Sequence, residues 1–307
     1  MAAANLRERI DAPVDARTVI DFVLGAAAVS AGVRACVHRP SDRGQAAAQQ
    51  FAAPAMQLPG LSIGSAVLSE TPGIDGGDIV DVYELDARFA LVLVADVCGR
   101  GAQAAAQTAF IRYAIRTLAL ENDGDPAVVL AKFNAMYFRT VKDDEAFVVL
   151  ILGVIDSQTG EVRYASAGHE PAFIRRRSGR LTMLEPTGPI IGAAAYSAYS
   201  SDVVRLESGD MLVWTTDGMT ESRDRQRRLL GAAGLARWIA AAPDDVAAVP
   251  ESLVAALQQR SGNVKGDDVA VLAVAYEAAT AGHAPVERRE RRAVSRPAML
   301  RKRRLLG

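Results

Sequence analysis

Two apolar segments separated by a short polar break place the strongest constraint on how this chain folds. Residues 79–85 and 89–97 are rich in β-branched and other apolar side chains, and residues 86–88 (Asp-Ala-Arg) stand between them. Segments of this length on either side of a short polar break are typical of a β-hairpin. The sequence therefore predicts an antiparallel pair of strands whose turn lies at residues 86–88.

The two predicted strands carry carboxylates at the same end of the hairpin. Asp78 stands directly before the first strand, and Asp96 stands near the end of the second. In an antiparallel pair these positions are neighbours, so their negative charges repel one another. A hard divalent cation between them relieves that repulsion, because carboxylate oxygens are its preferred ligands. Gly77 and Gly99 let the backbone approach a bound group, and the first hypothesis is therefore a metal site.

The same pattern, an acidic residue near a glycine at the end of an apolar strand, occurs at two later positions in the chain. Asp217 follows the run 211–216, and Asp267 and Asp268 precede the run 269–276. One such aspartate alone is most often an ordinary turn residue. If these strand ends are aligned in one sandwich, however, the carboxylates converge into a site of oxygen ligands, which selects Mg²⁺ or Mn²⁺. Several carboxylates suit a pair of ions about 4 Å apart that activate a water molecule for phosphoester hydrolysis.

The order of segments along the chain predicts an α+β fold, because hairpins interleaved with helices are not the pattern of a parallel βαβ array. The expected strands are residues 61–70, 79–85, 89–97, 147–155, 161–168, 172–177, 201–206, 211–216 and 269–276, and the expected helices are residues 102–120, 125–137, 231–241 and 250–260. The segment 181–195 is expected to be mostly loop. Arg112 and Arg116, four residues apart, are expected on the solvent face of their helix.

Composition bounds the class of protein. The chain has 307 residues, half of them hydrophobic, which is enough for a sizeable core. Its net charge of −1 gives no electrostatic reason to expect nucleic acid as a partner. The two cysteines, Cys36 and Cys98, match neither a disulfide framework nor a zinc-site spacing. With no signal peptide and no apolar run near the roughly 18 residues of a membrane span, we expect a cytoplasmic protein without a membrane span.

The two ends of the chain differ from its centre. Residues 1–50 are rich in alanine, and we expect helices there that either regulate the protein, through a partner or a second copy, or simply pack on the domain. Residues 278–307 form a basic tail, in which residues 284–307 hold nine Arg and Lys against two Glu. Such a tail cannot build a core and is expected to be disordered. Its charge fits either an acidic partner, anionic lipid or nucleic acid, or a solubilising role.

Six short motifs follow one another in an order typical of one enzyme family. They are Gln49-Gln50, Gly76-Gly77-Asp78 with Asp81, Asp96-Val97-Cys98-Gly99-Arg100-Gly101, Ala167-Gly168-His169-Glu170-Pro171, Thr216-Asp217-Gly218-Met219-Thr220-Glu221 and Asp267-Asp268-Val269-Ala270. With these motifs the chain resembles the PPM-type (protein phosphatase 2C-like) metal-dependent serine/threonine phosphatases, in the bacterial SpoIIE/RsbU branch. The resemblance covers about residues 45–277 and places the phosphatase domain at residues 51–277.

The resemblance implies a fold and a metal centre. The family fold is a β-sandwich of two antiparallel sheets flanked by helices, which agrees with the α+β pattern. By position, Asp78 is implied to bridge two ions, Mn²⁺ or Mg²⁺, and Asp96 to bind one of them together with the backbone carbonyl of Val97. The implied metal ligands are Asp78, Asp96, Val97, Asp217, Asp267 and Asp268, and the implied catalytic residues are Asp78, Asp96, Asp217 and Asp267.

The resemblance also implies an activity and a setting. The implied reaction is hydrolysis of phosphoserine or phosphothreonine by a metal-activated water, on a phosphorylated anti-sigma-factor antagonist in a partner-switching pathway. Control is expected from a separate regulatory protein or from a homodimer through the N-terminal helices. The rival hypothesis is a non-catalytic regulatory module that keeps the phosphatase fold and binds a signalling partner. A third hypothesis is a small-molecule phosphohydrolase, but the sequence has no Gly-rich nucleotide-binding loop to support it.

Three residues within the motifs have open roles. His169 is either a general acid or substrate contact, or a turn histidine that hydrogen-bonds locally; the second interpretation is favoured because the carboxylates already account for the chemistry. Arg100 is either a phosphate contact or a solvated loop charge. Cys98 stands where the family usually has serine, and a small buried spacer is the favoured interpretation.

Overall fold

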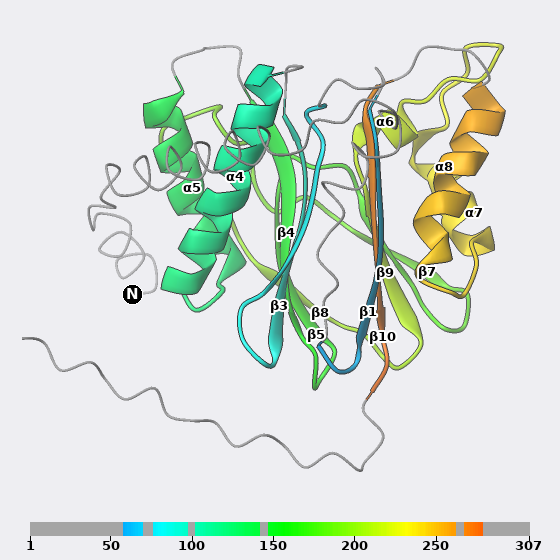
Figure 1. Ribbon diagram of the computed structural model, residues 1–307, viewed down its shortest axis with the longest axis horizontal. Coiled ribbons are helices and arrows are strands. Elements are labelled where there is room, and N and C mark those ends of the chain that lie inside the picture. Colours follow the sequence, from blue (N-terminus) through cyan, green and yellow to red (C-terminus); the bar gives the residue numbers. More distant parts are fainter. Residues whose placement is uncertain (1–57, 70–75, 98–101, 142–146, 262–266, 279–307) are drawn as a thin grey trace, which may run out of the picture.

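The fold is a sandwich of two β-sheets with helices on both outer faces (Figure 1). The computed structural model describes residues 58–69, 76–97, 102–141, 147–261 and 267–278, and its elements carry the labels of Figure 1. The predicted N-terminal helices and the basic tail beyond residue 278 lie outside the described residues. Cys98 and Arg100 lie outside them as well.

One sheet contains the hairpin that the sequence predicts. Its strand order is β2-β3-β4-β5-β8, and all neighbouring pairs are antiparallel. The strands are β2 (Ile79–Glu84), β3 (Phe89–Val97), β4 (Val148–Asp156), β5 (Glu161–Ala167) and β8 (Asp202–Arg205). Residues 90–95 of β3 are all buried, because this strand has a sheet neighbour on each side and packed residues on each face.

The second sheet is also antiparallel, with the order β1-β10-β9-β6-β7. Its strands are β1 (Leu61–Leu68), β10 (Val269–Tyr276), β9 (Asp210–Thr215), β6 (Ala172–Arg175) and β7 (Leu181–Leu184). Strand β7 corrects the sequence analysis, which expected mostly loop at residues 181–195. This edge strand has only four residues, of which Leu184 alone is buried, so it lacks the alternation from which a strand is recognised.

Helices cover the outer face of each sheet. α4 (Ala102–Glu121) and α5 (Pro126–Thr140) pack on the first sheet, and α7 (Gly231–Ala241) and α8 (Ala248–Ser261) pack on the second (Figure 1). A fifth helix, α6 (Asp217–Thr220), is a single turn that directly follows β9. The predicted α+β fold with two antiparallel sheets is therefore confirmed.

The start of α5 illustrates how local sequence sets an element boundary. The carboxylate of Asp125 accepts hydrogen bonds from the amides of Ala127 and Val128, at 3.1 and 3.3 Å. Pro126 occupies the first turn, where a missing N–H costs no helical hydrogen bond. These two residues satisfy the free amides at the helix terminus, and the predicted boundary at residues 125–126 is correct.

Trp214 anchors the core between the two sheets. This residue of β9 is fully buried, in a cluster of apolar side chains drawn from both sheets. Gly153 of β4 faces it: a Cβ atom at this position would lie 2.7 Å from the indole ring. The small residue therefore makes room for the large one across the interface between the sheets.

Arg112 and Arg116 correct a second expectation, because they do not lie on a solvent face. Arg112 donates to the carboxylate of Asp81 at 3.0 Å, and Arg116 Nε donates to it at 2.7 Å. The Asp81 side chain is fully buried, whereas the two arginine side chains are 17% and 20% exposed. The spacing of four residues correctly predicted that both arginines share one face of α4. That face is turned toward the sheet and not toward solvent, because both side chains bond to the buried Asp81 carboxylate in β2.

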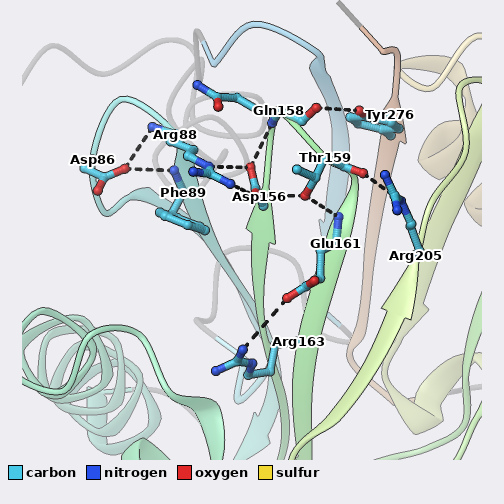
Figure 2. A network of polar contacts seen from close by, with 10 residues as sticks. All are labelled: Asp86, Arg88, Phe89, Asp156, Gln158, Thr159, Glu161, Arg163, Arg205 and Tyr276. Atoms are coloured by element: carbon cyan, nitrogen blue, oxygen red, sulfur yellow. Dashed lines mark hydrogen bonds and ion pairs between the residues drawn. The ribbon is translucent and has the colours of Figure 1, made fainter. Parts of the chain in front are cut away.

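A polar network closes the hairpin-turn end of the first sheet (Figure 2). The Asp156 carboxylate accepts from Arg88 Nε at 2.9 Å, from the amide of Gln158 at 2.9 Å and from Thr159 Oγ1 at 2.8 Å. Burial acts to raise the pKa of Asp156, but these hydrogen bonds outweigh it and the pKa is lowered. Tyr276 of the second sheet donates its hydroxyl to the Gln158 carbonyl at 3.1 Å, so the network also joins the two sheets.

The described residues contain no helix that combines the length and apolar character needed to cross a membrane.

Candidate metal centre

Asp78 and Asp96 lie next to one another at the open end of the β2–β3 hairpin. Ile79 pairs with Ala95 in the antiparallel register, which makes Asp78 and Asp96 the next opposed positions. After burial, the charge of Asp96 is the next cause that raises the pKa of Asp78, as expected for neighbouring carboxylates. The hairpin thus brings together the two residues that the sequence analysis singled out first.

The other predicted aspartates lie at one end of the second sheet. Thr215, the last residue of β9, is close to the start of β10, where it pairs with Val271. The residues that follow β9 and those that precede β10 therefore share an end of the sheet. Asp217 begins α6, which lies at that end (Figure 1), and Asp267 and Asp268 lead into β10.

Thr216 joins the two sheets at this end. Its hydroxyl donates to Asp78 Oδ2 at 2.6 Å and accepts the amide of Ala270 at 2.8 Å. Its own amide donates to the Ala270 carbonyl at 3.1 Å. In the sequence Thr216 is recognisable only as the residue directly before Asp217 in the motif at residues 216–221. The structure shows that it holds Asp78 of one sheet against β10 of the other.

Asp267 and Asp268 occupy different environments. Asp268 Oδ2 accepts the amide of Gly77 at 3.0 Å, and its Oδ1 accepts the hydroxyl of Ser69 at 3.2 Å. Asp267 is exposed, and its carboxylate accepts the amide of Asp268 at 2.9 Å. Asp268 therefore fixes the glycine turn that carries Asp78, while Asp267 retains carboxylate oxygens that face solvent.

Three glycines permit the close approach of these segments. A Cβ atom at Gly77 would overlap the carbonyl oxygen of Val97 and lie 3.4 Å from Asp96 Oδ1. A Cβ atom at Gly76 would overlap the Asp268 carboxylate, and one at Gly218 would overlap the Asp268 carbonyl. Any larger residue would push the oxygen atoms apart, so the glycines are required by the geometry and not by turn conformation alone.

The carboxylates raise one another's pKa. Burial raises the pKa of Asp78 well above its ordinary value, Asp96 raises it further, and the hydrogen bond from Thr216 opposes both. Burial, followed by the charge of Asp217, raises the pKa of Asp96 to about 6. Burial also raises the pKa of Asp217, with Glu221 as the next cause. Negative charge is therefore unfavourable here without a cation, which favours the binding of one.

The donor set fits a hard divalent cation. The converging groups are carboxylate and backbone carbonyl oxygens, which Mg²⁺ and Mn²⁺ prefer. Within the ranges that the structure describes, no three His, Cys, Asp or Glu side chains lie close enough to form a ready-made metal-binding cluster. Asp78 is held instead by Thr216, and Asp268 by Gly77 and Ser69. The residues fit the ions in chemistry and charge, and their roles as ligands stay a prediction.

His169 is buried in the turn that follows β5. Its side chain is 2% exposed, and burial lowers its pKa to about 4, so the imidazole is neutral at pH 7. In the neutral ring, Nδ1–H donates to the Glu170 carbonyl at 3.0 Å, while Nε2 has no hydrogen-bond partner among the described residues. The Glu170 carboxylate accepts the hydroxyl of Thr220 in α6 at 2.9 Å. This environment favours the interpretation of His169 as a locally bonded turn residue.

A family model covers most of the described chain. The model of Stage II sporulation protein E (SpoIIE) matches residues 86–277, which include both sheets except β1 and β2.

Two relatives are similar in sequence over part of their length. Protein IcfG of Synechocystis sp. (strain ATCC 27184 / PCC 6803 / Kazusa) is 30% identical over 227 residues, which cover 64% of this chain and 35% of IcfG. Phosphoserine phosphatase RsbU of Bacillus subtilis (strain 168) is 33% identical over 133 residues, which cover 43% of this chain and 39% of RsbU. The matches thus span little more than a third of either relative.

Solved structures share the fold. The RsbU and RsbW domains of Rv1364c from Mycobacterium tuberculosis match with a TM-score of 0.61 at 25% identity, over 73% of this chain and 62% of that one. The catalytic domain of the serine/threonine protein phosphatase PstP, solved in complex with two manganese ions, matches with a TM-score of 0.50 at 13% identity, over 71% and 99%. At the identity of the second pair, the likeness concerns the fold alone.

Proposed function

The chain belongs to the Stage II sporulation protein E (SpoIIE) family, and on that premise we propose that residues 51–277 form a phosphatase domain that hydrolyses phosphoserine or phosphothreonine in proteins. The observation that supports the proposal is that carboxylates from both sheets lie at one end of the sandwich and raise one another's pKa there, after the larger effect of burial. Asp78 and Asp96 come from the first sheet, and Asp217 and Asp267 come from the second. Mutual repulsion among them favours a bound cation.

We assign these carboxylates to two divalent ions, either Mn²⁺ or Mg²⁺. The proposed ligands are Asp78, Asp96, Asp217, Asp267, Asp268 and the backbone carbonyl of Val97. Two such ions, when bound, activate a water molecule and offset the charge of the phosphoryl group. Thr216 orients the Asp78 carboxylate through its 2.6 Å hydrogen bond, and Asp268 also accepts the amide of Gly77 and so holds the glycine turn that carries Asp78.

Direct hydrolysis, without a phosphorylated enzyme intermediate, agrees with the side chains near the centre. His169 is the only histidine among the described residues, and it is neutral at pH 7 with its Nδ1–H already bonded to the Glu170 carbonyl. It therefore has no acidic proton to donate at that pH.

We further propose that the substrate is a phosphorylated anti-sigma-factor antagonist in a partner-switching pathway. The support is that one relative is named phosphoserine phosphatase RsbU, and that a solved structure of the same fold combines RsbU and RsbW domains. Control would come from a separate regulatory protein or from a homodimer through residues 1–50. The competing function is a regulatory module that binds a signalling partner without turnover.

Hydrolysis of p-nitrophenyl phosphate separates the two functions. We expect turnover with Mn²⁺ or Mg²⁺, loss of turnover with EDTA and recovery when the metal is restored. Asp217→Asn should lose this turnover, while the matched control Asp244→Asn, an exposed residue beyond the far end of α7, should keep it. A folded protein without hydrolysis at any concentration of either ion would favour the regulatory module.

A further inference from the structure

An arginine-rich loop follows directly after the helix that carries Asp217. Residues 221–230 connect α6 to α7, and after Glu221 the arginine-rich part, residues 222–230, reads Ser-Arg-Asp-Arg-Gln-Arg-Arg-Leu-Leu. Four arginines in this loop (Arg223, Arg225, Arg227 and Arg228) are exposed, whereas its single acidic residue, Asp224, is buried. In a chain with a net charge of −1, this is a local concentration of positive charge that the proposed chemistry does not use.

Asp224 holds the loop in one conformation. Its Oδ1 accepts the amides of Gln226 and Arg228, each at 2.9 Å, and its Oδ2 accepts Arg228 Nε at 2.8 Å. Arg227 adopts φ of +63°, which a side-chain-bearing residue rarely does without such support. Arg260 of α8 donates to the Arg228 carbonyl at 2.8 Å and ties the loop to the helical layer. The loop is therefore ordered before any partner binds.

Three of the four exposed arginines do not take part in the ion pair that holds the loop. Among the described residues, Arg223, Arg225 and Arg227 form no ion pair, and only Arg223 makes a side-chain hydrogen bond, to the Arg227 carbonyl at 3.0 Å. A rigid loop that presents unpaired guanidinium groups to solvent loses little entropy when an anionic partner binds. Guanidinium groups also suit carboxylate and phosphate oxygens, because their N–H groups form paired hydrogen bonds.

The position of the loop relates it to the candidate metal centre. It begins within two residues of α6 and lies at the same end of the sandwich as that helix (Figure 1). Below it, an open hollow of about 430 Å³ lies between α7 and α8, lined by Asp224, Trp238, Ala256, Gln259 and Arg260. One exposed acidic residue, Glu221, stands directly before the arginines, whereas Asp244, Asp245 and Glu251 lie away from the loop, between the far end of α7 and the start of α8.

We propose that the arginine loop and the hollow beneath it dock an acidic surface of the phosphoprotein substrate, near its phosphorylated residue. This inference rests on the proposed phosphatase function and adds where the substrate binds and which charge it carries. The chain's own tail cannot be the occupant, since it is basic. Nucleic acid fits less well, because its continuous negative charge would also extend over the carboxylates around Asp217. A protein with a local acidic patch avoids that repulsion.

Matched peptides test the proposal without requiring turnover. The probes are two fluorescein-labelled phosphoserine peptides, one with glutamates on both sides of the phosphoserine and one with glutamines instead, and binding is followed by fluorescence anisotropy. The loop variant is Arg223→Gln/Arg225→Gln/Arg227→Gln. The control variant, Arg163→Gln/Arg177→Gln/Arg180→Gln, removes the same charge from exposed positions on the strands and turns of the sheets. Circular dichroism checks that both variants are folded.

The wild-type protein should bind the glutamate peptide about tenfold more tightly than the glutamine peptide at low ionic strength, and this preference should shrink as salt screens exposed charges. The loop variant should lose the preference, and the control variant should keep it. Equal affinities in the wild type, or a preference that survives in the loop variant, would overturn the proposal. An RNA oligonucleotide that binds the loop more tightly than the glutamate peptide would also overturn it. Failure of the phosphatase function would show separately, as absence of p-nitrophenyl phosphate hydrolysis by the wild type.

Discussion

The hydroxyl of Thr216 shows what a sequence can and cannot predict about a single residue. The aspartates of the candidate centre were recognisable because each stands beside a glycine at the end of an apolar strand. Thr216 has no such signature, because its role depends on Asp78, which lies 138 positions earlier in the chain and in the other sheet. Its hydrogen bond to Asp78 exists only when the two sheets are packed face to face.

Replacing Thr216 by valine should lower the free energy of unfolding by about 1–2 kcal/mol, because the Ala270 amide loses its acceptor while side-chain volume is nearly conserved. Metal-dependent turnover should fall as well, since Asp78 loses the donor that orients it. Thr216→Ser is the matched control and should retain most of both properties. Urea unfolding and a Mn²⁺ titration of activity measure the two effects, and a valine variant that behaves like the serine variant would rule out the positioning role.

At the scale of elements, the sequence predicted nearly every helix and strand but not which charged faces are buried. The spacing of Arg112 and Arg116 places them on one face of α4, and from the helix alone that face looks exposed. The partner that buries it, Asp81, is in β2, and although Asp81 belongs to the first aspartate motif, nothing in the sequence pairs it with α4. Strand β7 was missed for the opposite reason, since its four residues owe their pairing to β6 and carry little pattern of their own.

Replacing Asp81 by asparagine should destabilise the fold by about 3 kcal/mol, because two arginines would then face the sheet without a countercharge. The triple variant Asp81→Leu/Arg112→Met/Arg116→Met removes all three charges and should recover most of that loss. Chemical denaturation of the three proteins gives the comparison. If the single and triple variants are equally stable, the ion-pair cluster does not join α4 to the sheet.

The Asp156 network at the hairpin-turn end predicts a pH dependence of stability. The pKa of Asp156 is lowered in the fold, so its contribution is present above the unfolded-state value of about 4 and is lost as the pH falls through the lower folded-state value. Asp156→Asn should therefore cost about 1–2 kcal/mol at pH 7, and the difference from wild type should narrow below about pH 4. Urea unfolding at pH 7, 4 and 3 measures it. A difference that widens on acidification would contradict the assignment.

For the whole molecule, apolar patterning identified the α+β class and its antiparallel sheets, but it could not give the strand order. In the second sheet, β10 lies between β1 and β9, so strands from opposite ends of the domain are neighbours. Such pairings depend on packing between distant segments, and no local pattern reports them. The convergence of the aspartates could be predicted only as a conditional statement, because it required the ends of both sheets to be aligned.

Truncation after residue 280 should leave thermal stability and p-nitrophenyl phosphate turnover unchanged, because the chain has by then completed β10. Truncation after residue 268 should prevent folding, since it removes a strand with a neighbour on each side. Thermal unfolding followed by circular dichroism distinguishes the two truncated proteins. A large loss of stability in the longer one would show that the basic tail packs on the domain.

The central claim, that carboxylates from both sheets form one divalent-metal centre for phosphoester hydrolysis, is tested most directly by Mn²⁺ binding to Asp78→Asn. We expect isothermal titration calorimetry to show Mn²⁺ binding to the wild-type protein and a clear loss in the variant, with unchanged circular dichroism. Turnover of p-nitrophenyl phosphate should fall by more than about a hundredfold, because removing a ligand costs both metal affinity and the activated water. Wild-type Mn²⁺ affinity and near-normal turnover in Asp78→Asn would contradict the account.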